Sequence, residues 1–402
     1  MTNGTSQGLF VVVAIIIFGI FVLISYLLFK DNLKPTLANI FTDGLKQATC
    51  NLLSECPIDI VADREDEKYL YAKIREADES TGETEIWVRA EKLDNGTLKI
   101  DRSSISDANY TAQGSTEMTG SLIMPDSING MKIIGIGDGD KISLENSWTN
   151  NSVFTTALFD GTIRLPAYLT YISHATFKSS TFSGTIDIPK NVTIIGMAAF
   201  WTSTFEGEIE LPNGLTAIGD YAFDNSKFSG ELKLPRGLTR VGGFGSSIFS
   251  GNLTLPNGLT TIGYNAFQKS TFQGKLILPD RLTTIGATAF RKSTFEGEIE
   301  LPSGLTAIGN SAFTNSTFSG ELKLPKGVKI DISAFQNSAF SGTLDVSNVT
   351  SIQMGAFTNS KIDKVIRGDV EMSDGSSMSN TSGIHPRSIK LANGAWYNGS
   401  ND

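Results

Sequence analysis

Residues 208–230 read EIELPNGLTAIGDYAFDNSKFSG, and variants of this 23-residue unit fill the middle of the 402-residue chain. A Leu-Pro dipeptide, once Ile-Pro, marks each copy, and successive copies are 23 residues apart except for one step of 21. Regular self-similarity at this period predicts a solenoid, in which each coil contacts only its neighbours and one core runs through the stack. The dipeptides begin at Leu165, Ile188, Leu211, Leu234, Leu255, Leu278, Leu301 and Leu324.

Each unit contains the side chains that a coil of a solenoid needs. In the predicted strand Glu-Ile-Glu-Leu, Ile209 and Leu211 face the core while Glu208 and Glu210 face solvent. Pro212 has no N–H for a strand ladder and ends the strand. Two phenylalanines per unit form columns through the predicted core, where each contributes about 1.5–3 kcal/mol on burial. The columns are Phe154, Phe177, Phe200, Phe223, Phe244, Phe267, Phe290, Phe313, Phe335, Phe357 and Phe159, Phe182, Phe205, Phe228, Phe249, Phe272, Phe295, Phe318, Phe340.

Three further features describe the array itself. A serine recurs once per unit, from Ser180 to Ser360, and is expected to hydrogen-bond the backbone of adjacent coils. The 21-residue step lacks two residues before Phe244, in VGGFGSS, which predicts a local kink. Residues 206–235 and 296–325 are identical at 25 of 30 positions, which indicates a duplicated block. A spacer or an adhesive surface tolerates such changes in length better than an active site does.

The unit L-x-L-P-x-G-L-T-x-I-G-x-x-A-F-x-x-S-x-F-x-G resembles the leucine-rich repeat of the BspA-like bacterial surface proteins. That family's pattern is similar to I-x-I-P-x-x-V-T-x-I-G-x-x-A-F-x-x-C-x-x-L, and the likeness covers residues 118–366. Ser replaces the common Cys, and Phe-x-Gly replaces Leu, which are changes in packing. The resemblance implies a leucine-rich repeat solenoid with a strand and a short turn or helical segment per coil. It also implies a role in cell-surface adhesion, but no binding motif is carried over.

The N-terminal part predicts attachment to a membrane. After a short tail of residues 1–8, residues 9–29 form a run of 21 residues without charge, long enough to span a hydrocarbon core of roughly 30 Å. The run is too long for a cleaved signal peptide and lacks a basic segment before it. Lys30 and Lys34 follow the run and weakly favour a cytoplasmic repeat domain, whereas the family resemblance favours an extracellular one.

Residues 30–57 predict an amphipathic stalk or linker, separated from the membrane helix by Pro35. The chain's two cysteines, Cys50 and Cys56, lie in this stalk. They form either a small disulfide loop, if the region is extracellular, or a pair of reduced thiols.

Residues 58–117 predict a small β-rich domain that caps the N-terminal end of the solenoid. Residues 69–77 and 84–93 alternate as strands do, and Asn95-Gly96 is a hairpin signal before a strand at 97–100. The solenoid, residues 118–366, has an insertion near 141–151, predicted to be a surface loop that contains Trp148. Residues 367–402 are rich in Gly, Ser, Asn and Asp and predict a C-terminal cap or tail.

The outward side chains of the predicted strands form two columns of mixed charge, which are the leading candidate for a ligand-binding face. Stacked at about 4.8 Å, they extend over roughly 40 Å. The alternative is a solvated face that keeps the array soluble. The charged candidates are Glu208, Glu210, Glu231, Lys233, Lys275, Glu298, Glu300, Glu321 and Lys323.

The inventory of residues argues against catalysis, metals and nucleic acid. The net charge of −9 lacks the basic footprint of a nucleic-acid-binding protein. His174 and His385 are the only histidines, and no Ser–His–Asp or Cys–His constellation accompanies them. No cofactor is therefore expected. The sequence predicts a single-pass membrane protein of the cell surface that binds a protein or surface ligand. The alternatives are a structural spacer and a pilin-like assembly subunit.

Overall fold

The computed structural model describes residues 57–108, 110, 115–139, 142–145, 153–367, 370–371 and 389–390. Residues from Asp59 onward form one compact unit. The predicted membrane helix at 9–29, the stalk as far as residue 56, and Cys50 and Cys56 lie outside the described residues and remain predictions. Within the described ranges, no helix is long and apolar enough to cross a membrane.

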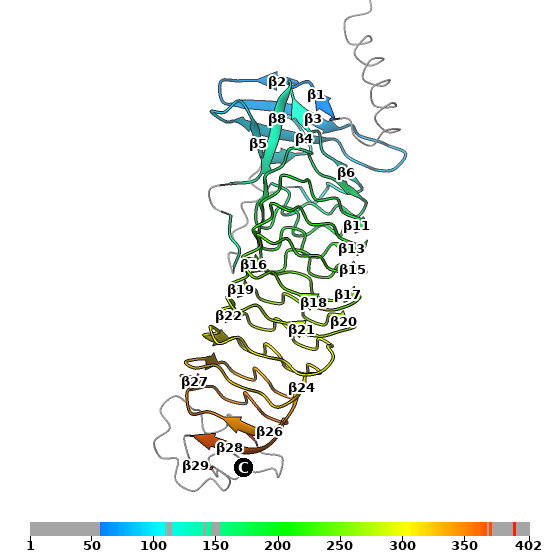
Figure 1. The fold of residues 1–402 in the computed structure, drawn as a ribbon. Helices are drawn as coiled ribbons and strands as arrows, with labels where there is room; N and C mark the ends of the chain where they lie inside the picture. The colour runs from blue at the N-terminus through cyan, green and yellow to red at the C-terminus, as the bar shows by residue number, and fades with distance from the viewer. Residues whose placement is uncertain are drawn as a thin grey trace, which may run out of the picture. The chain divides into compact units, whose positions relative to one another are not determined.

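A short parallel strand recurs in every coil and builds one continuous sheet along the solenoid (Figure 1). Most of these strands are the x-Ile pair of a Thr-x-Ile motif, with Val241 in place of the isoleucine in one coil and Val328 in place of the threonine in another. Equivalent residues pair between coils, as Ile172 does with Ile195. The strands are β8 (Met131–Ile136), β10 (Tyr171–Ile172), β12 (Ile194–Ile195), β14 (Ala217–Ile218), β16 (Arg240–Val241), β19 (Thr261–Ile262), β22 (Thr284–Ile285), β23 (Ala307–Ile308), β25 (Lys329–Ile330) and β27 (Ser351–Ile352).

The sequence prediction placed the strand of each coil in the segment before Leu-Pro, and the structure confirms this in only some coils. Ile163–Arg164, Leu253–Thr254 and Leu276–Ile277 form strands there, whereas residues 208–211 form none. The continuous sheet lies instead at the Thr-x-Ile segment, which the prediction missed. The glycine after the isoleucine lets the backbones approach closely there: a Cβ at Gly196 would lie 2.7 Å from the Cα of His174 in the preceding coil.

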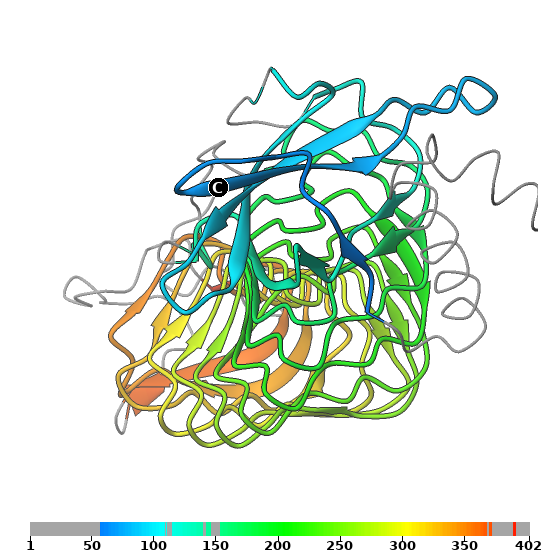
Figure 2. The ribbon, with the colours of Figure 1, turned by 90° about the horizontal axis from the view of Figure 1, so that it is seen from above.

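Turns and short strands complete each coil. The described residues contain no helix, so the return segment consists of turns rather than the short helical segment that the sequence left open. Figure 2, turned by 90°, shows the coils superposed along the stack. The remaining strands of the coils are β6 (Leu122–Ile123), β9 (Ile163–Arg164), β11 (Ser183–Gly184), β13 (Thr204–Gly207), β15 (Lys227–Phe228), β17 (Ile248–Phe249), β18 (Leu253–Thr254), β20 (Thr271–Phe272), β21 (Leu276–Ile277), β24 (Ser319–Gly320), β26 (Ala339–Asp345), β28 (Lys361–Arg367) and β29 (Val370–Glu371).

Antiparallel strands extend the same sheet at its N-terminal end. β3 (Tyr69–Arg75), β4 (Ile86–Lys92) and β5 (Leu98–Ser104) pair in sequence order, and β2 (Arg64–Glu65) pairs with β3. These strands match the segments expected from the alternating sequence. β5 then pairs in parallel with β8, and β1 (Asp59–Ile60) pairs with β7 (Ser127–Ile128). The first coil therefore does not expose a free sheet edge on this side.

The two predicted phenylalanine columns form the core. In the first, neighbouring rings stack at centroid distances from 5.0 Å, between Phe335 and Phe357, to 6.1 Å, between Phe244 and Phe267. Rings of the two columns meet edge to face within each coil, as Phe290 and Phe295 do at 5.6 Å. Stacked and edge-to-face pairs are both favourable geometries for aromatic rings.

Hydroxyl groups tie the coils together on two sides of this core. The serine column bonds mainly to the preceding coil as predicted, for example from Ser226 Oγ to the Ser203 carbonyl at 3.3 Å, whereas Ser316 and Ser360 bond within their own coils. A threonine column, which the sequence analysis did not identify, does the same beside the sheet. Its bonds join Thr193 to Thr170, Thr216 to Thr193, Thr239 to Thr216, Thr260 to Thr239, Thr283 to Thr260 and Thr306 to Thr283.

The 21-residue coil interrupts this regularity. Its strand β16 pairs with β14 at a single position, Ala217 with Arg240. Phe228 meets Phe244 edge-on at 6.1 Å, and the first column is at its widest on the two sides of Phe244, at 5.7 and 6.1 Å. The missing pair of residues therefore changes the packing of the neighbouring coils.

The substitution Phe290→Ala should destabilise the protein by about 3–5 kcal/mol, because it removes a fully buried ring that stacks on both neighbours. Urea denaturation followed by circular dichroism measures the effect. The exposed Ser303→Ala is the control and should change the free energy of unfolding by less than about 0.5 kcal/mol. A loss of under about 1 kcal/mol for Phe290→Ala would contradict a core held by these columns.

Candidate functional site

The nine charged candidate residues all lie exposed on one side of the coils, in the segment before each Leu-Pro. The residue between each pair of outward positions is buried, as Ile209, Leu232 and Ile299 show at 3–6% exposure. This alternation directs the charged side chains to solvent. Because residues 208–211 are not part of a ladder, the aligned coils hold the columns in register. We call this surface the charged ribbon.

The charged ribbon contains the same set of four charges twice. The first set is Glu208, Glu210, Glu231 and Lys233, and the second is Glu298, Glu300, Glu321 and Lys323. The first glutamate of each set lies against the next coil in the same way: a Cβ at Gly230 or at Gly320 would lie 2.6 Å from that glutamate's Cγ. Both glycines have a positive φ, of 76° and 85°, a conformation that glycine adopts without strain. Four coils separate the two sets.

Most charges of the ribbon have no partner of opposite sign. Lys233 and Glu231 approach to 3.6 Å with both side chains largely exposed. The other seven candidates form no ion pair with any residue that the structure describes. Between the two sets lies Ile277, which is 55% exposed. Exposed charges around an apolar side chain are typical of the rim and centre of a protein interface.

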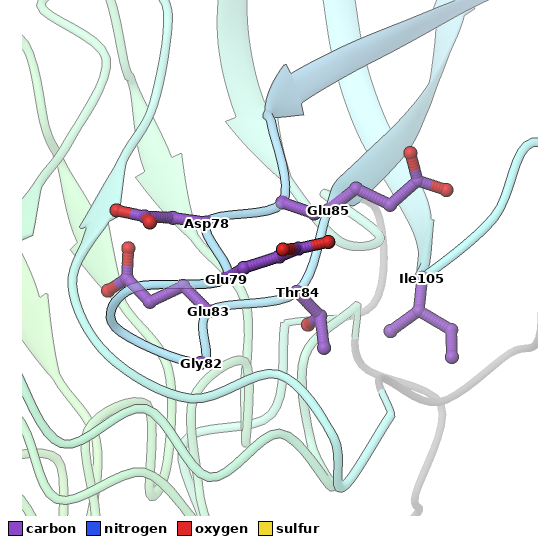
Figure 3. A pocket seen from close by; sticks show the side chains of 8 residues that line it. Asp78, Glu79, Gly82, Glu83, Thr84, Glu85 and Ile105 are labelled. Carbon is purple, nitrogen blue, oxygen red and sulfur yellow. The ribbon is translucent and has the colours of Figure 1, made fainter.

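A shallow depression of about 360 Å³ lies at the N-terminal hairpin, lined by residues 77–79, 82–85 and Ile105 (Figure 3). Its carboxylates have structural partners. Asp78 accepts hydrogen bonds from the N–H and hydroxyl of Ser80, and Glu83 accepts one from the Ser121 N–H at 3.2 Å. Glu85 lies 3.6 Å from Lys73. The acidic loop therefore fastens the hairpin to the first coil and offers no free constellation for catalysis.

The described residues of the insertion, 142–145, lie along the solenoid. They cross several coils, and the carbonyls of Ser143 and Leu144 accept hydrogen bonds from the amides of Met197 and Asp220 at 2.9 and 3.0 Å. We call residues 142–145 the strap. These residues have no regular secondary structure and are half-buried or exposed, as expected for a surface loop, but the backbone amides of adjacent coils fasten them to the solenoid. Trp148 lies outside the described residues.

The strap ends at a buried charge cluster in the short coil. Arg240 donates hydrogen bonds to Asp220 at 2.6 Å and to Glu145 at 2.5 Å, and Asp220 also accepts one from the Tyr264 amide at 2.9 Å. The Asp220 side chain is 4% exposed and that of Arg240 is 11% exposed. Burial raises the pKa of the Asp220 carboxyl, although Arg240 opposes the shift. The sequence analysis missed this cluster, whose signal is an arginine where other coils have Tyr, Ile, Ala, Thr, Lys or Ser.

The remaining reactive side chains that the structure describes do not assemble a catalytic or metal site. His174 is 7% exposed, and burial lowers its pKa, so its imidazole is neutral at pH 7. The nearby Asp138 opposes this shift. In the described ranges, no three His, Cys, Asp or Glu side chains are grouped so that they could hold a metal ion. His385 lies outside these ranges.

Comparison with known proteins agrees with the repeat architecture. The model of the BspA type leucine rich repeat region matches residues 149–251 and 243–363, with six copies. These matches span more than half of the chain. No protein with a curated description matches the sequence.

Three solved structures resemble the chain weakly, each with a TM-score below 0.5. YopM from Yersinia enterocolitica is 14% identical, with a TM-score of 0.37 over 62% of this chain and 52% of YopM, about half of its length. The pneumococcal vaccine antigen PcpA is 16% identical, with a TM-score of 0.39 over 76% of this chain and 86% of PcpA. A leucine-rich repeat protein from Bacteroides ovatus is 16% identical, with a TM-score of 0.34 over 75% of this chain and 94% of its own. At these identities the likeness concerns the fold alone.

Arg240→Ala should lower the free energy of unfolding at pH 7 by about 3 kcal/mol, because it leaves the buried Asp220 carboxylate without its cation. The raised pKa of Asp220 means that the folded state binds its proton more tightly, so this group's contribution to stability falls as pH rises above the ordinary value of 3.8. Without Arg240 the pKa of Asp220 rises further, and the loss of unfolding free energy that the substitution causes should shrink below pH 4. Urea denaturation at pH 3.5 and pH 7 tests this; an equal loss at both values would contradict it.

Proposed function

The chain belongs to the BspA-type leucine-rich repeat family, and from this premise we propose that it binds a protein or surface ligand outside the cell. In this proposal residues 9–29 anchor the chain in the membrane, and the charged ribbon is the ligand-binding face. The observation that carries the proposal is the set of seven exposed charges in register that lack an ion-pair partner, with exposed Ile277 among them.

The charges of the ribbon indicate what kind of ligand fits. Each of its two sets combines three glutamates and one lysine, a formal charge of −2 (−3 + 1). A ligand surface with a positive patch would therefore approach the ribbon faster and dock in a defined register. Because such charges act across solvent, they contribute more to association rate and specificity than to affinity, and salt should weaken their effect.

Protease treatment of intact cells that make the full chain tests its location. We expect mass spectrometry to recover peptides from residues 150–366 in the medium, because the proposal places the repeats on the extracellular side of the anchor at 9–29. Peptides that are protected in intact cells and cleaved only after lysis would contradict an extracellular location.

Adhesion of the same cells to surfaces coated with extracellular-matrix proteins tests the ribbon. Glu298→Lys with Glu300→Lys should reduce saturable adhesion about tenfold at low salt, because the second set then repels a basic ligand. The matched control is Glu67→Lys with Glu79→Lys, two exposed glutamates of the N-terminal sheet. An equal loss of adhesion in both variants would refute the charged ribbon as the ligand-binding face. Chains exposed on the cell that bind none of the coats in a saturable way would favour a spacer.

A further inference from the structure

The strap lies on a column of backbone amides that continues beyond it. In each coil, the residue two positions after the buried isoleucine of Thr-x-Ile occupies an equivalent place. From Met197 onward, and except at Tyr264, which follows the short coil, its carbonyl accepts a hydrogen bond from the preceding coil, as those of Asn310 and Ile332 do from the amides of Thr288 and Ser311. We call the amides of these residues the amide line. They belong to Met197, Asp220, Tyr264, Ala287, Asn310, Ile332 and Met354.

The first part of the amide line is occupied. Consecutive strap residues, Ser143 and Leu144, accept from consecutive coils at Met197 and Asp220, and Glu145 reaches Arg240 in the coil after these. The Tyr264 amide is satisfied by the Asp220 carboxylate, which reaches across the short coil. Under this cover Met197 and Asp220 are 0% and 3% exposed. One residue of the extended strap per coil therefore accepts the hydrogen bond of each amide, and the strap covers the side chains of the amide line.

The second part of the amide line is open. The amides of Ala287, Asn310, Ile332 and Met354 donate to no acceptor among the residues that the structure describes. Side chains along this part are also uncovered: Ile332 is 42% exposed and Met354 is 48% exposed. An unsatisfied row of donors beside exposed apolar side chains is the arrangement that an added extended peptide completes.

We propose that this open part of the amide line binds an extended, acidic peptide segment of another protein. Its carbonyls accept from the four amides, as those of the strap do farther up the line. Its apolar side chains cover Ile332 and Met354. In this mode, main-chain hydrogen bonds supply affinity and side chains supply specificity.

The charges beside the open part select the acidic peptide. Ring contacts between Trp201 and Tyr221, and between Tyr221 and Tyr264, show that the amide line and the turns that follow it share one surface. In the coils from Thr261 to Asn359, this surface bears four cations and one carboxylate. They are Lys269, Arg291, Lys292, Lys329 and Asp331. A peptide with carboxylates beside its apolar residues complements both features.

The two copies of the duplicated block differ on this surface but not on the charged ribbon. Residues 206–235 and 296–325 carry identical charges on the ribbon, yet three of their five differences fall on the other surface. Asp220, Tyr221 and Asp224, beside the strap, correspond to Asn310, Ser311 and Thr314 on the open part. The proposal is therefore independent of the proposed function of the ribbon.

A synthetic peptide with the strap sequence DKISLENS, residues 140–147, is a suitable first probe because it carries both apolar and acidic side chains. Titrated into the full chain in lipid nanodiscs, it should bind saturably and slow hydrogen exchange at the amides of Ala287, Asn310, Ile332 and Met354. Ile332→Glu with Met354→Glu should weaken binding about tenfold or more, equivalent to at least about 1.4 kcal/mol.

The matched control is Val61→Glu with Ile248→Glu, which changes two apolar residues of 73% and 64% exposure outside the amide line. It should leave peptide binding unchanged. If neither this peptide nor a displayed pool of random dodecapeptides slows exchange at the four amides, the proposal is wrong. Slow exchange there before any peptide is added would also overturn it, since a segment of the chain itself or a second copy would then occupy the line.

Discussion

The whole unit depends on one constraint: a single coil cannot bury its own apolar side chains and must bury them against the next coil. Phe290 is covered because Phe267 and Phe313 stack on its two faces at 5.5 and 5.3 Å. The backbone, the hydroxyl groups and the rings must therefore all repeat with one common spacing. Any property that varies freely is confined to the outside of the coils, where the charged ribbon and the amide line lie.

This constraint explains which features could be predicted from sequence. The phenylalanine columns follow directly from the period, because a residue that recurs at every coil in the same apolar context is buried in all of them. The segment before Leu-Pro alternates as strands do but pairs in only some coils, as at Leu253–Thr254 with Leu276–Ile277; the continuous ladder at Thr-x-Ile was missed because pairing depends on how closely two backbones approach. That approach is set by the glycine after the isoleucine, and periodicity alone does not distinguish it from other repeated glycines. The nine ribbon residues are exposed as their alternation requires, but alternation says nothing about a ligand.

The short coil shows how the stack accommodates a break in its period. Removing two residues before Phe244 brings Tyr221 and Tyr264, which belong to coils on opposite sides of the short one, to a centroid distance of 5.0 Å. Asp220 bridges the same gap to the Tyr264 amide, and Arg240 balances its buried charge while also pairing with Glu145. Such a cluster couples residues 95 positions apart, so it could not be predicted from the repeat unit.

The strap is also linked structurally to the two-residue deletion in the short coil. A continuous amide line would offer the strap one more donor in the short coil, but the residue that would carry it is among the two that are missing. Arg240 supplies a side-chain donor there and forms an ion pair with Glu145 of the strap. Beyond the break the equivalent residues of the coils recur at intervals of 23 and then 22 residues, so that each coil again carries one amide of the line. The molecule thus divides one repeated row of donors into a part that its own insertion satisfies and a part left open for an extended partner.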